Sequence, residues 1–151
     1  MIDIVDKNTR SKMMAGIRGK NTRPELFVRS VLHRRGYRFR IHRTDLPGSP
    51  DIVLPKYSLA IFVHGCFWHR HAYCKKAAIP GTNAGRWTDK FSANIVRDAK
   101  DISSLLANGW RVLVLWECGI NSRDLNEDWL IQIINDRRET YIEWPILKAS
   151  S

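Results

Sequence analysis

Three cysteines and two histidines are placed in the sequence where they could bind one metal ion. Cys66, His69, His71 and Cys74 fall within nine residues, and Cys118 directly follows a later apolar segment. Three thiolates and one imidazole make a closed tetrahedral set, which is typical of structural rather than catalytic zinc. His71 is favoured over His69 as the fourth ligand, but the spacing alone does not separate them. The alternative is three reduced, partly buried cysteines without metal.

Asp51 is the candidate ligand for a hard metal ion such as Mg²⁺, because hard cations prefer oxygen ligands. It opens a short apolar segment, residues 51–54, directly after a Pro- and Gly-rich turn at 47–50. Its carboxylate should therefore project at a sheet edge, near the end of the segment that contains His64. The alternative is an aspartate that only caps the turn.

Asp98 is a carboxylate within an apolar stripe of a predicted helix. The stripe recurs every three or four residues, at Phe91, Ile95, Asp98, Ile102 and Leu105. A carboxylate on a buried helix face needs a hydrogen-bonding partner. His64 and His69 are the available imidazoles, and Arg97 or Arg111 would serve instead. A histidine oriented by a carboxylate can transfer protons near neutral pH.

Large aromatic side chains lie beside these candidate ligands. Phe67 and Trp68 sit between Cys66 and His69, and Trp87 follows the next loop. Apolar rings can enter DNA between base pairs and unstack them. The two interpretations, an exposed aromatic wedge or ordinary core residues, are about equally supported by the sequence.

The composition describes one basic domain, residues 1–151. The 151 residues are 44% hydrophobic and 26% charged, with a net charge of +10. Residues 1–43 contain 12 Lys and Arg against 3 Asp and Glu, so most of the excess charge lies at the front of the chain. Such an uneven distribution favours nucleic acid as the partner. Residues 1–20 are expected to form a basic arm or small helix that contacts DNA.

Membrane and secreted proteins are excluded by the same inspection. The longest apolar runs, 59–63 and 112–116, are far shorter than the roughly 20 residues of a membrane-spanning helix. The first ten residues hold two acids and no apolar region, which is not typical of a secretory signal. A cytoplasmic location is therefore expected, and the odd number of cysteines argues against disulfides.

The elements that must position these residues alternate between strand and helix periods. Thr22, Pro24 and Glu25 form a capping-box pattern at the start of a helix, which should stop at Gly36. Strands are predicted at 37–42, 51–54, 59–64, 111–116 and, at an edge, 140–144; further helices are predicted at 88–108 and 125–138. The second and third strands should pair as a hairpin. The pattern indicates an α/β fold with helices on both faces of a mixed sheet.

The motifs together strongly resemble the very short patch repair (Vsr) DNA mismatch endonucleases. The resemblance rests on the segments 6–12 (DKNTRSK), 46–51 (LPGSPD), 62–69 (FVHGCFWH), 94–98 (NIVRD) and 109–118 (GWRVLVLWEC). It covers most of the chain, and the 62–69 segment is highly specific. It implies a restriction-endonuclease-like fold with a structural zinc site, and a bacterial protein that acts at the nucleoid as a monomer.

The activity that the resemblance implies is magnesium-dependent nicking of double-stranded DNA, 5′ to the thymine of a T:G mismatch. Such mismatches arise from deaminated 5-methylcytosine, and mismatch-repair proteins are possible partners. The implied roles are Mg²⁺ binding by Asp51 and the Val63 carbonyl, and proton transfer by His69 with support from His64, Asp98 and Glu25. Zn²⁺ would be held by Cys66, His71, Cys74 and Cys118, and DNA would be entered by Phe67, Trp68 and Trp87, with Met14 in the minor groove.

Two departures from the family pattern are visible. Val63 stands where the family commonly has threonine, and one extra residue separates His71 from Cys74. A backbone carbonyl at position 63 is available whatever the side chain, so activity is expected to survive. Two other functions remain open: a zinc-stabilised DNA-binding module without catalysis, and a restriction-like nuclease that cuts matched sites.

Overall fold

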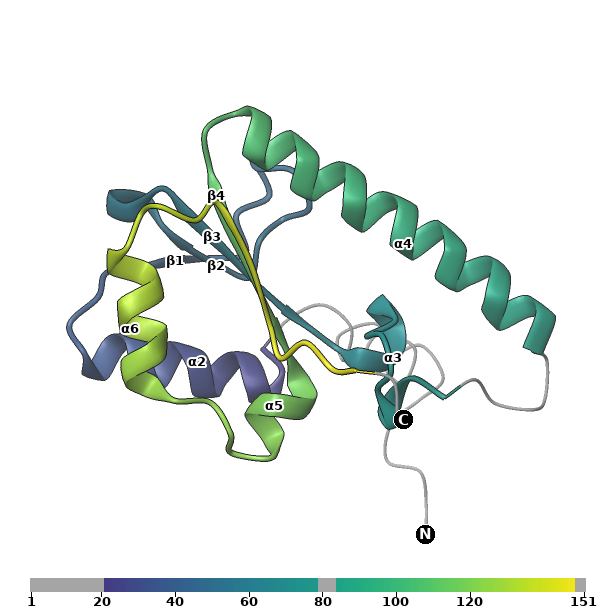
Figure 1. Cartoon of the computed structure of the whole chain (residues 1–151). Helices are drawn as coiled ribbons and strands as arrows, with labels where there is room; N and C mark the ends of the chain where they lie inside the picture. The colour runs from purple at the N-terminus through teal and green to yellow at the C-terminus, as the bar shows by residue number, and fades with distance from the viewer. Residues whose placement is uncertain (1–20, 79–83, 149–151) are drawn as a thin grey trace, which may run out of the picture.

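A computed structural model describes residues 21–78 and 84–148, so the predicted arm at 1–20, Met14 included, lies outside the described residues. Five strands form one mixed sheet in the order β1-β2-β3-β4-β5 (Figure 1). Strands β1, β2 and β3 are antiparallel, whereas β3, β4 and β5 are parallel. Their bounds are β1 (Arg40–Ile41), β2 (Ile52–Leu54), β3 (Leu59–His64), β4 (Arg111–Trp116) and β5 (Tyr141–Trp144).

Helices cover both faces of this sheet, as predicted. The long helix α4 lies along one face, and α2 and α6 lie on the other (Figure 1). The bounds are α2 (Arg23–Arg34), α3 (Cys66–His69), α4 (Ala84–Ala107), α5 (Glu117–Asn121) and α6 (Glu127–Asn135). Within the described residues, no helix is both long enough and apolar enough to cross a membrane.

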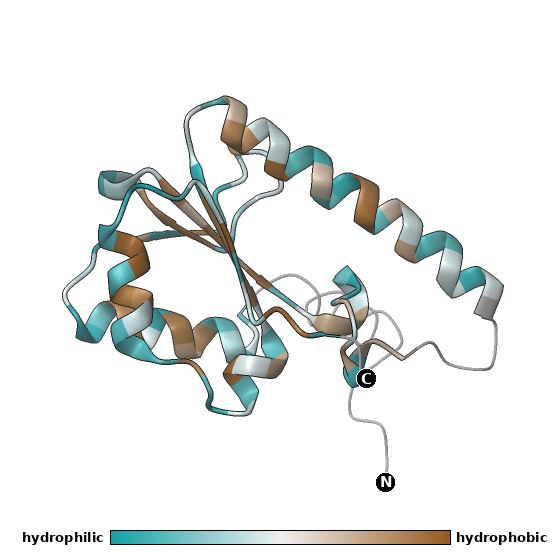
Figure 2. Ribbon diagram, in the orientation of Figure 1, coloured by the Kyte–Doolittle hydropathy of each residue, from teal (hydrophilic) through white to brown (hydrophobic). Residues whose placement is uncertain are grey.

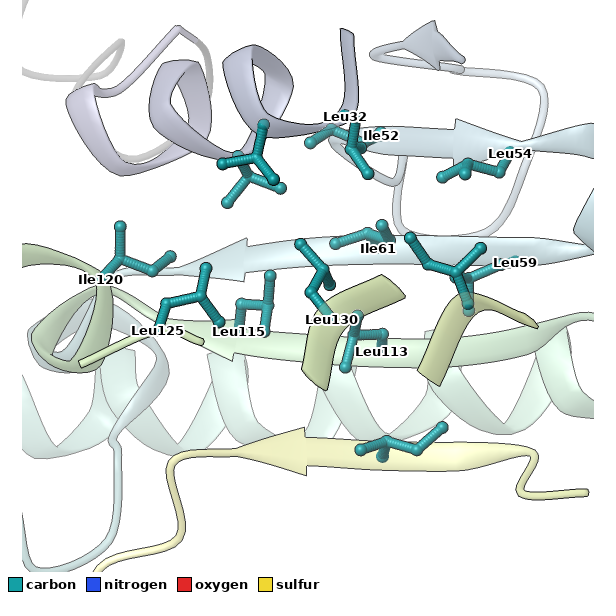
Figure 3. Close-up of a cluster of buried hydrophobic side chains, with 14 residues drawn as sticks. Leu32, Ile52, Leu54, Leu59, Ile61, Leu113, Leu115, Ile120, Leu125 and Leu130 are labelled. Atoms are coloured by element: carbon teal, nitrogen blue, oxygen red, sulfur yellow. The ribbon is translucent and has the colours of Figure 1, made fainter. Parts of the chain in front are cut away.

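Alternation along the central strands divides the interior into two cores. On β3, Leu59 and Ile61 face α2 and α6, while Ala60 and Phe62 face α4. Figure 3 shows the core that lies between the sheet and helices α2 and α6. Figure 2 shows that apolar residues dominate the strands between the helices. Because successive side chains of a strand point to opposite faces, the same alternation turns His64 toward α4. The strand period therefore decides which layer the candidate site occupies.

The start of α2 follows the predicted cap only in part. Thr22 accepts a hydrogen bond from the backbone N–H of Glu25 at 3.3 Å, and Gly36 ends the segment with a φ of +83°. The Glu25 carboxylate does not complete a capping box. It accepts hydrogen bonds from Arg29 and His42 instead, so its role is tertiary rather than local.

Several predicted boundaries were wrong for identifiable reasons. The strand predicted at 37–42 keeps only Arg40 and Ile41, and it ends before His42, whose backbone has a left-handed φ of 49°. Helix α4 begins at Ala84 rather than 88, which places Trp87 one turn before Phe91, with ring centroids 5.9 Å apart. Helix α5 was not predicted, and Ile95, expected on the inner stripe, is 50% exposed.

Helix α6 is shorter than predicted because a buried arginine terminates it. Arg111, 5% exposed at the start of β4, donates hydrogen bonds to the carbonyls of Ile133, Ile134, Asp136 and Glu139. Carbonyls at a helix C-terminus lack partners within the helix. One side chain thus satisfies the end of α6 and the turn that leads to β5.

Replacing Arg111 should therefore be costly. Arg111→Met leaves several carbonyls without a partner, and we expect the free energy of unfolding to fall by about 2–4 kcal/mol. Urea denaturation measures the change. Arg138→Met, which alters a fully exposed side chain, should leave the unfolding midpoint nearly unchanged; equal effects of the two substitutions would contradict this account of α6.

Candidate functional site

Three cysteines and one histidine converge where β3 and β4 end. Cys66 opens α3 directly beyond β3, and Cys118 lies in α5 directly beyond β4, while His71 and Cys74 follow α3. The ligand atoms of all four residues lie within 4.8 Å of one another. The structure therefore brings together the whole Cys₃His set that the sequence analysis named.

The distances in this cluster match those of a tetrahedral zinc site. His71 Nδ1 lies 3.6 Å from Cys66 Sγ and 3.5 Å from Cys118 Sγ. Zinc bonds of about 2.3 Å to sulfur and about 2.1 Å to nitrogen, at tetrahedral angles, give an S···N edge of about 3.6 Å. The other ring nitrogen of His71, Nε2, lies 2.7 Å from the carbonyl oxygen of Pro145, to which it can donate. That contact leaves Nδ1 free to bind a metal.

Burial makes the thiols of Cys66 and Cys118 poor acids in the absence of a cation. It raises the pKa of Cys66, and the neighbouring cysteines add to this; burial also raises the pKa of Cys118. A metal ion reverses this preference, because it binds the thiolate. The donor set, its geometry and its burial thus suit zinc.

A second group of titratable residues surrounds a cavity of about 240 Å³ on the α4 side of the sheet. Asp51, directly before β2, lines this cavity together with Val63, His64, His69, Asp98 and His42. Asp51 Oδ2 accepts a hydrogen bond from the backbone N–H of Val63 at 2.7 Å. Burial raises the pKa of Asp51 to about 7, against the effect of that hydrogen bond. A cation bound here would favour the ionised form.

His69 and Asp98 form the predicted histidine–carboxylate pair. His69 Nδ1 lies 2.6 Å from Asp98 Oδ2, and the His69 ring stacks on His64 with centroids 3.9 Å apart. Burial, followed by the neighbouring His69, lowers the pKa of His64 well below its usual range, so His64 is held neutral. The two arginines that were alternative partners for Asp98 bond to other residues. Arg97 donates to Asn94, and Arg111 donates to carbonyls at the end of α6.

Glu25, on α2, lies against His42 and Asp51 of this cavity and belongs to a second pair. Its carboxylate is 1% exposed, lies 2.6 Å from His42 Nε2 and accepts a hydrogen bond from Arg29 at 2.9 Å. The ligand atoms of Glu25, His42 and Asp51 all lie within 4.8 Å of one another. Glu25 was a candidate only through the family resemblance, and the sequence analysis missed His42 and Arg29 altogether. No local pattern marks these two residues, because their contacts are tertiary.

The aromatic residues form a half-buried cluster beside the metal ligands. Phe67 makes edge contacts with Trp68, Trp87 and Phe91, with centroids 5.0 to 5.3 Å apart. Lys90 lies 5.6 Å from the Trp68 ring centre. The cluster is neither a free wedge nor a closed core, since only Phe91 is fully buried.

Comparison with known proteins identifies the family of the chain. Residues 2–76 match the family model described as DNA mismatch endonuclease Vsr. The chain is 41% identical over 142 residues to DNA mismatch endonuclease Vsr of Escherichia coli (strain K12), covering 94% of this chain and 88% of that protein. The chain belongs to the Vsr family. Membership in this family of endonucleases identifies the chain as a nuclease.

Two nicking enzymes are also similar to the chain over nearly their whole length. Type II nicking enzyme V.XorIIP of Xanthomonas oryzae pv. oryzae (strain KACC10331 / KXO85) is 46% identical over 135 residues, which are 89% of this chain and 98% of that enzyme. Type II nicking enzyme V.NmeAIP of Neisseria meningitidis serogroup A / serotype 4A (strain DSM 15465 / Z2491) is 37% identical, over 92% of this chain and 99% of that enzyme.

The metal cluster gives a prediction that separates the two histidines near α3. The purified protein should contain about one zinc ion per chain. His71→Asn should lose most of that zinc and lower the melting temperature, because it removes a ligand. His69→Asn should retain it. Elemental analysis after dialysis against a mild chelator measures both; zinc loss from the His69 variant alone would reverse the assignment.

Proposed function

We propose that this Vsr-family nuclease is a magnesium-dependent enzyme that nicks double-stranded DNA 5′ to the thymine of a T:G mismatch and so initiates very short patch repair. The observation that carries the proposal is the cavity in which Asp51 lies beside the His69–Asp98 pair. Phosphodiester hydrolysis needs an oxygen-ligand metal site and a proton acceptor within reach of one phosphate. Asp51 and His69 would supply them, and the names of two relatives describe a nicking enzyme and a DNA mismatch endonuclease.

The residues around Asp51 fit Mg²⁺. Of the three carboxylates that the family resemblance names, Glu25 bonds to Arg29 and His42, and Asp98 bonds to His69. Asp51 accepts a hydrogen bond from a backbone N–H and has a raised pKa. A bound cation would therefore stabilise the ionised form of Asp51 more than that of the other two carboxylates. The Asp51 carboxylate and the Val63 carbonyl would hold the ion, which when bound would stabilise negative charge on the phosphate.

His69 would act as the proton acceptor in this proposal. Asp98 holds Nδ1 of the ring at 2.6 Å, so the opposite nitrogen, Nε2, is left to take a proton from a water molecule. His64 packs flat against His69 and stays neutral. It therefore supports the ring orientation without adding a second charge.

Recognition of DNA would divide between charge and aromatic rings. The basic surplus of residues 1–43 would attract the phosphate backbone. Phe67, Trp68 and Trp87 would enter the duplex beside the mismatch, with Met14 approaching from the minor groove. Zinc would stabilise the turn that presents these rings, since Cys66 and His71 bracket Phe67 and Trp68 in the sequence.

We infer a restriction-endonuclease-like fold, a single domain over residues 1–151 and a monomeric protein. Mismatch-repair proteins are proposed as possible partners. Residues 1–20 are proposed as the arm that contacts DNA.

The nicking reaction is tested with end-labelled duplexes that differ only by T:G, T:A or C:G at one position, in several flanking contexts. A magnesium-dependent nick confined to the thymine strand of T:G is expected. Asp51→Asn, which preserves the size and the bond to Val63, should slow nicking at least about 100-fold and still bind DNA. Binding without cleavage would favour the DNA-binding module, and equal cutting of matched duplexes the restriction-like nuclease.

The aromatic cluster gives a second test on the same duplexes. Phe67→Ala and Trp68→Ala should reduce the preference for T:G over T:A by about tenfold, because stacking of one ring on a base contributes about 1–3 kcal/mol. Affinity for matched DNA should change less. Competition binding measures both. Tyr73→Ala, which alters an exposed ring outside the cluster, is the control, and an equal effect there would contradict the assignment.

A further inference from the structure

His42 lines the cavity and forms a second histidine–carboxylate pair, with Glu25, in which His42 has no role in the proposed mechanism. His42 directly follows β1, and its backbone N–H donates to the carbonyl of Asp51 at 3.1 Å. This bond lies one step beyond the last β1–β2 pair, Ile41 with Ile52. The side chains of both residues line the cavity.

The order of the strands places the two histidine pairs on either side of Asp51. His42 follows β1, Asp51 precedes β2, and His64 ends β3 with His69 stacked on it. Asp51 is tied to both neighbours, through the His42 backbone on one side and the Val63 N–H on the other. A phosphate bound at Asp51 would thus have an imidazole at each side.

The contacts of His42 resemble those of His69. Each ring has one nitrogen 2.6 Å from a carboxylate oxygen, which orients the ring and leaves the other nitrogen, Nδ1 in His42, for another partner. Arg29 completes the surroundings of this ring, since its Nη2 lies 3.3 Å from His42 Nε2. Arg29 is itself bonded to Glu25, so the three groups form one compact network.

We propose that His42 is a further catalytic residue, the proton donor to the oxygen that leaves the scissile phosphate. This inference rests on the proposed nuclease function. In an in-line displacement, the attacking and leaving oxygens lie on opposite sides of phosphorus. With His69 beside the attacking water, the residue across Asp51 faces the leaving oxygen.

The proposed hydrolysis uses one water molecule, His69 and His42. A lone pair of the water oxygen forms the new bond to phosphorus, and one water proton passes to His69. The bond from phosphorus to the bridging oxygen breaks, and its electron pair stays on that oxygen, which takes a proton from His42. The products are a DNA end with a hydroxyl group and a DNA end with a phosphate. Solvent then reprotonates His42 and deprotonates His69.

A sulfur substitution in the DNA tests this role. T:G duplexes are prepared with oxygen throughout, with a 3′-bridging sulfur or with a 5′-bridging sulfur at the nicked position. A thiolate leaves without protonation, because thiols are far stronger acids than alcohols. His42→Gln keeps a donor for Glu25 but cannot transfer a proton. It should slow single-turnover nicking of the oxygen duplex about 100-fold and act near the wild-type rate on one sulfur duplex.

His69→Gln and His33→Gln are the matched controls. The His69 variant should be slow on every duplex, and the variant at His33, an exposed residue at the end of α2, should match the wild type on all. Each rate is compared within one preparation, so a partly folded variant does not bias the ratio; His42→Asn replaces His42→Gln if the latter does not fold.

The outcomes distinguish this inference from the function on which it rests. Rescue of His42→Gln by one sulfur duplex supports the proposal and identifies the leaving oxygen. An equal defect on oxygen and sulfur duplexes, as expected if His42 only orders the site or binds metal, overturns it, as does no defect at all. If the wild type does not nick any T:G duplex, the proposed function fails as well.

Discussion

The parallel pairing of β3 with β4 is the constraint on which both centres depend. Its register sets His64 opposite Trp116, and Cys66 and Cys118 each follow two residues later. The thiols therefore meet because the strands end together. Trp116 contacts one histidine from each centre, His64 edge-on at 5.2 Å and His71 stacked at 4.3 Å. A register shift of one residue would turn His64 away from the cavity and separate the two cysteines.

Prediction from sequence succeeded where a local pattern carried the information. Strands β3 and β4 are continuous apolar runs, and Asp98 was recognisable as a carboxylate on an inner helix face that needed a partner. The pattern erred at Ile95, because the inner row of α4 runs through Asn94, which is 8% exposed and bonds to the Trp68 carbonyl. His42 could not be found, because its role depends on a left-handed backbone and on Glu25, 17 residues away.

The wall of the cavity opposite β3 depends on a very close approach between a turn and α4. Gly48 has a φ of +74°, and a Cβ at that position would lie 2.9 Å from Cβ of Asp101. Any other residue would be strained in its backbone and would push α4 away. Since Asp98 lies one turn earlier on the same helix, the turn at Gly48 also sets how far the His69 pair stands from Asp51.

The contacts within the aromatic cluster bear on how much free energy recognition of DNA can gain. In the free protein, Phe67 already packs edge-on against three other rings. Rings that enter a duplex exchange these contacts for contacts with bases. The free energy gained is therefore only the difference between ring–base stacking and the ring–ring contacts that are lost. The free energy needed to unstack the DNA then varies more between matched and mismatched duplexes than the ring contacts do, and it is smallest at a mismatch. Discrimination would then arise because a mismatched base pair is easier to unstack than a matched one, rather than from hydrogen bonds between the protein and particular bases.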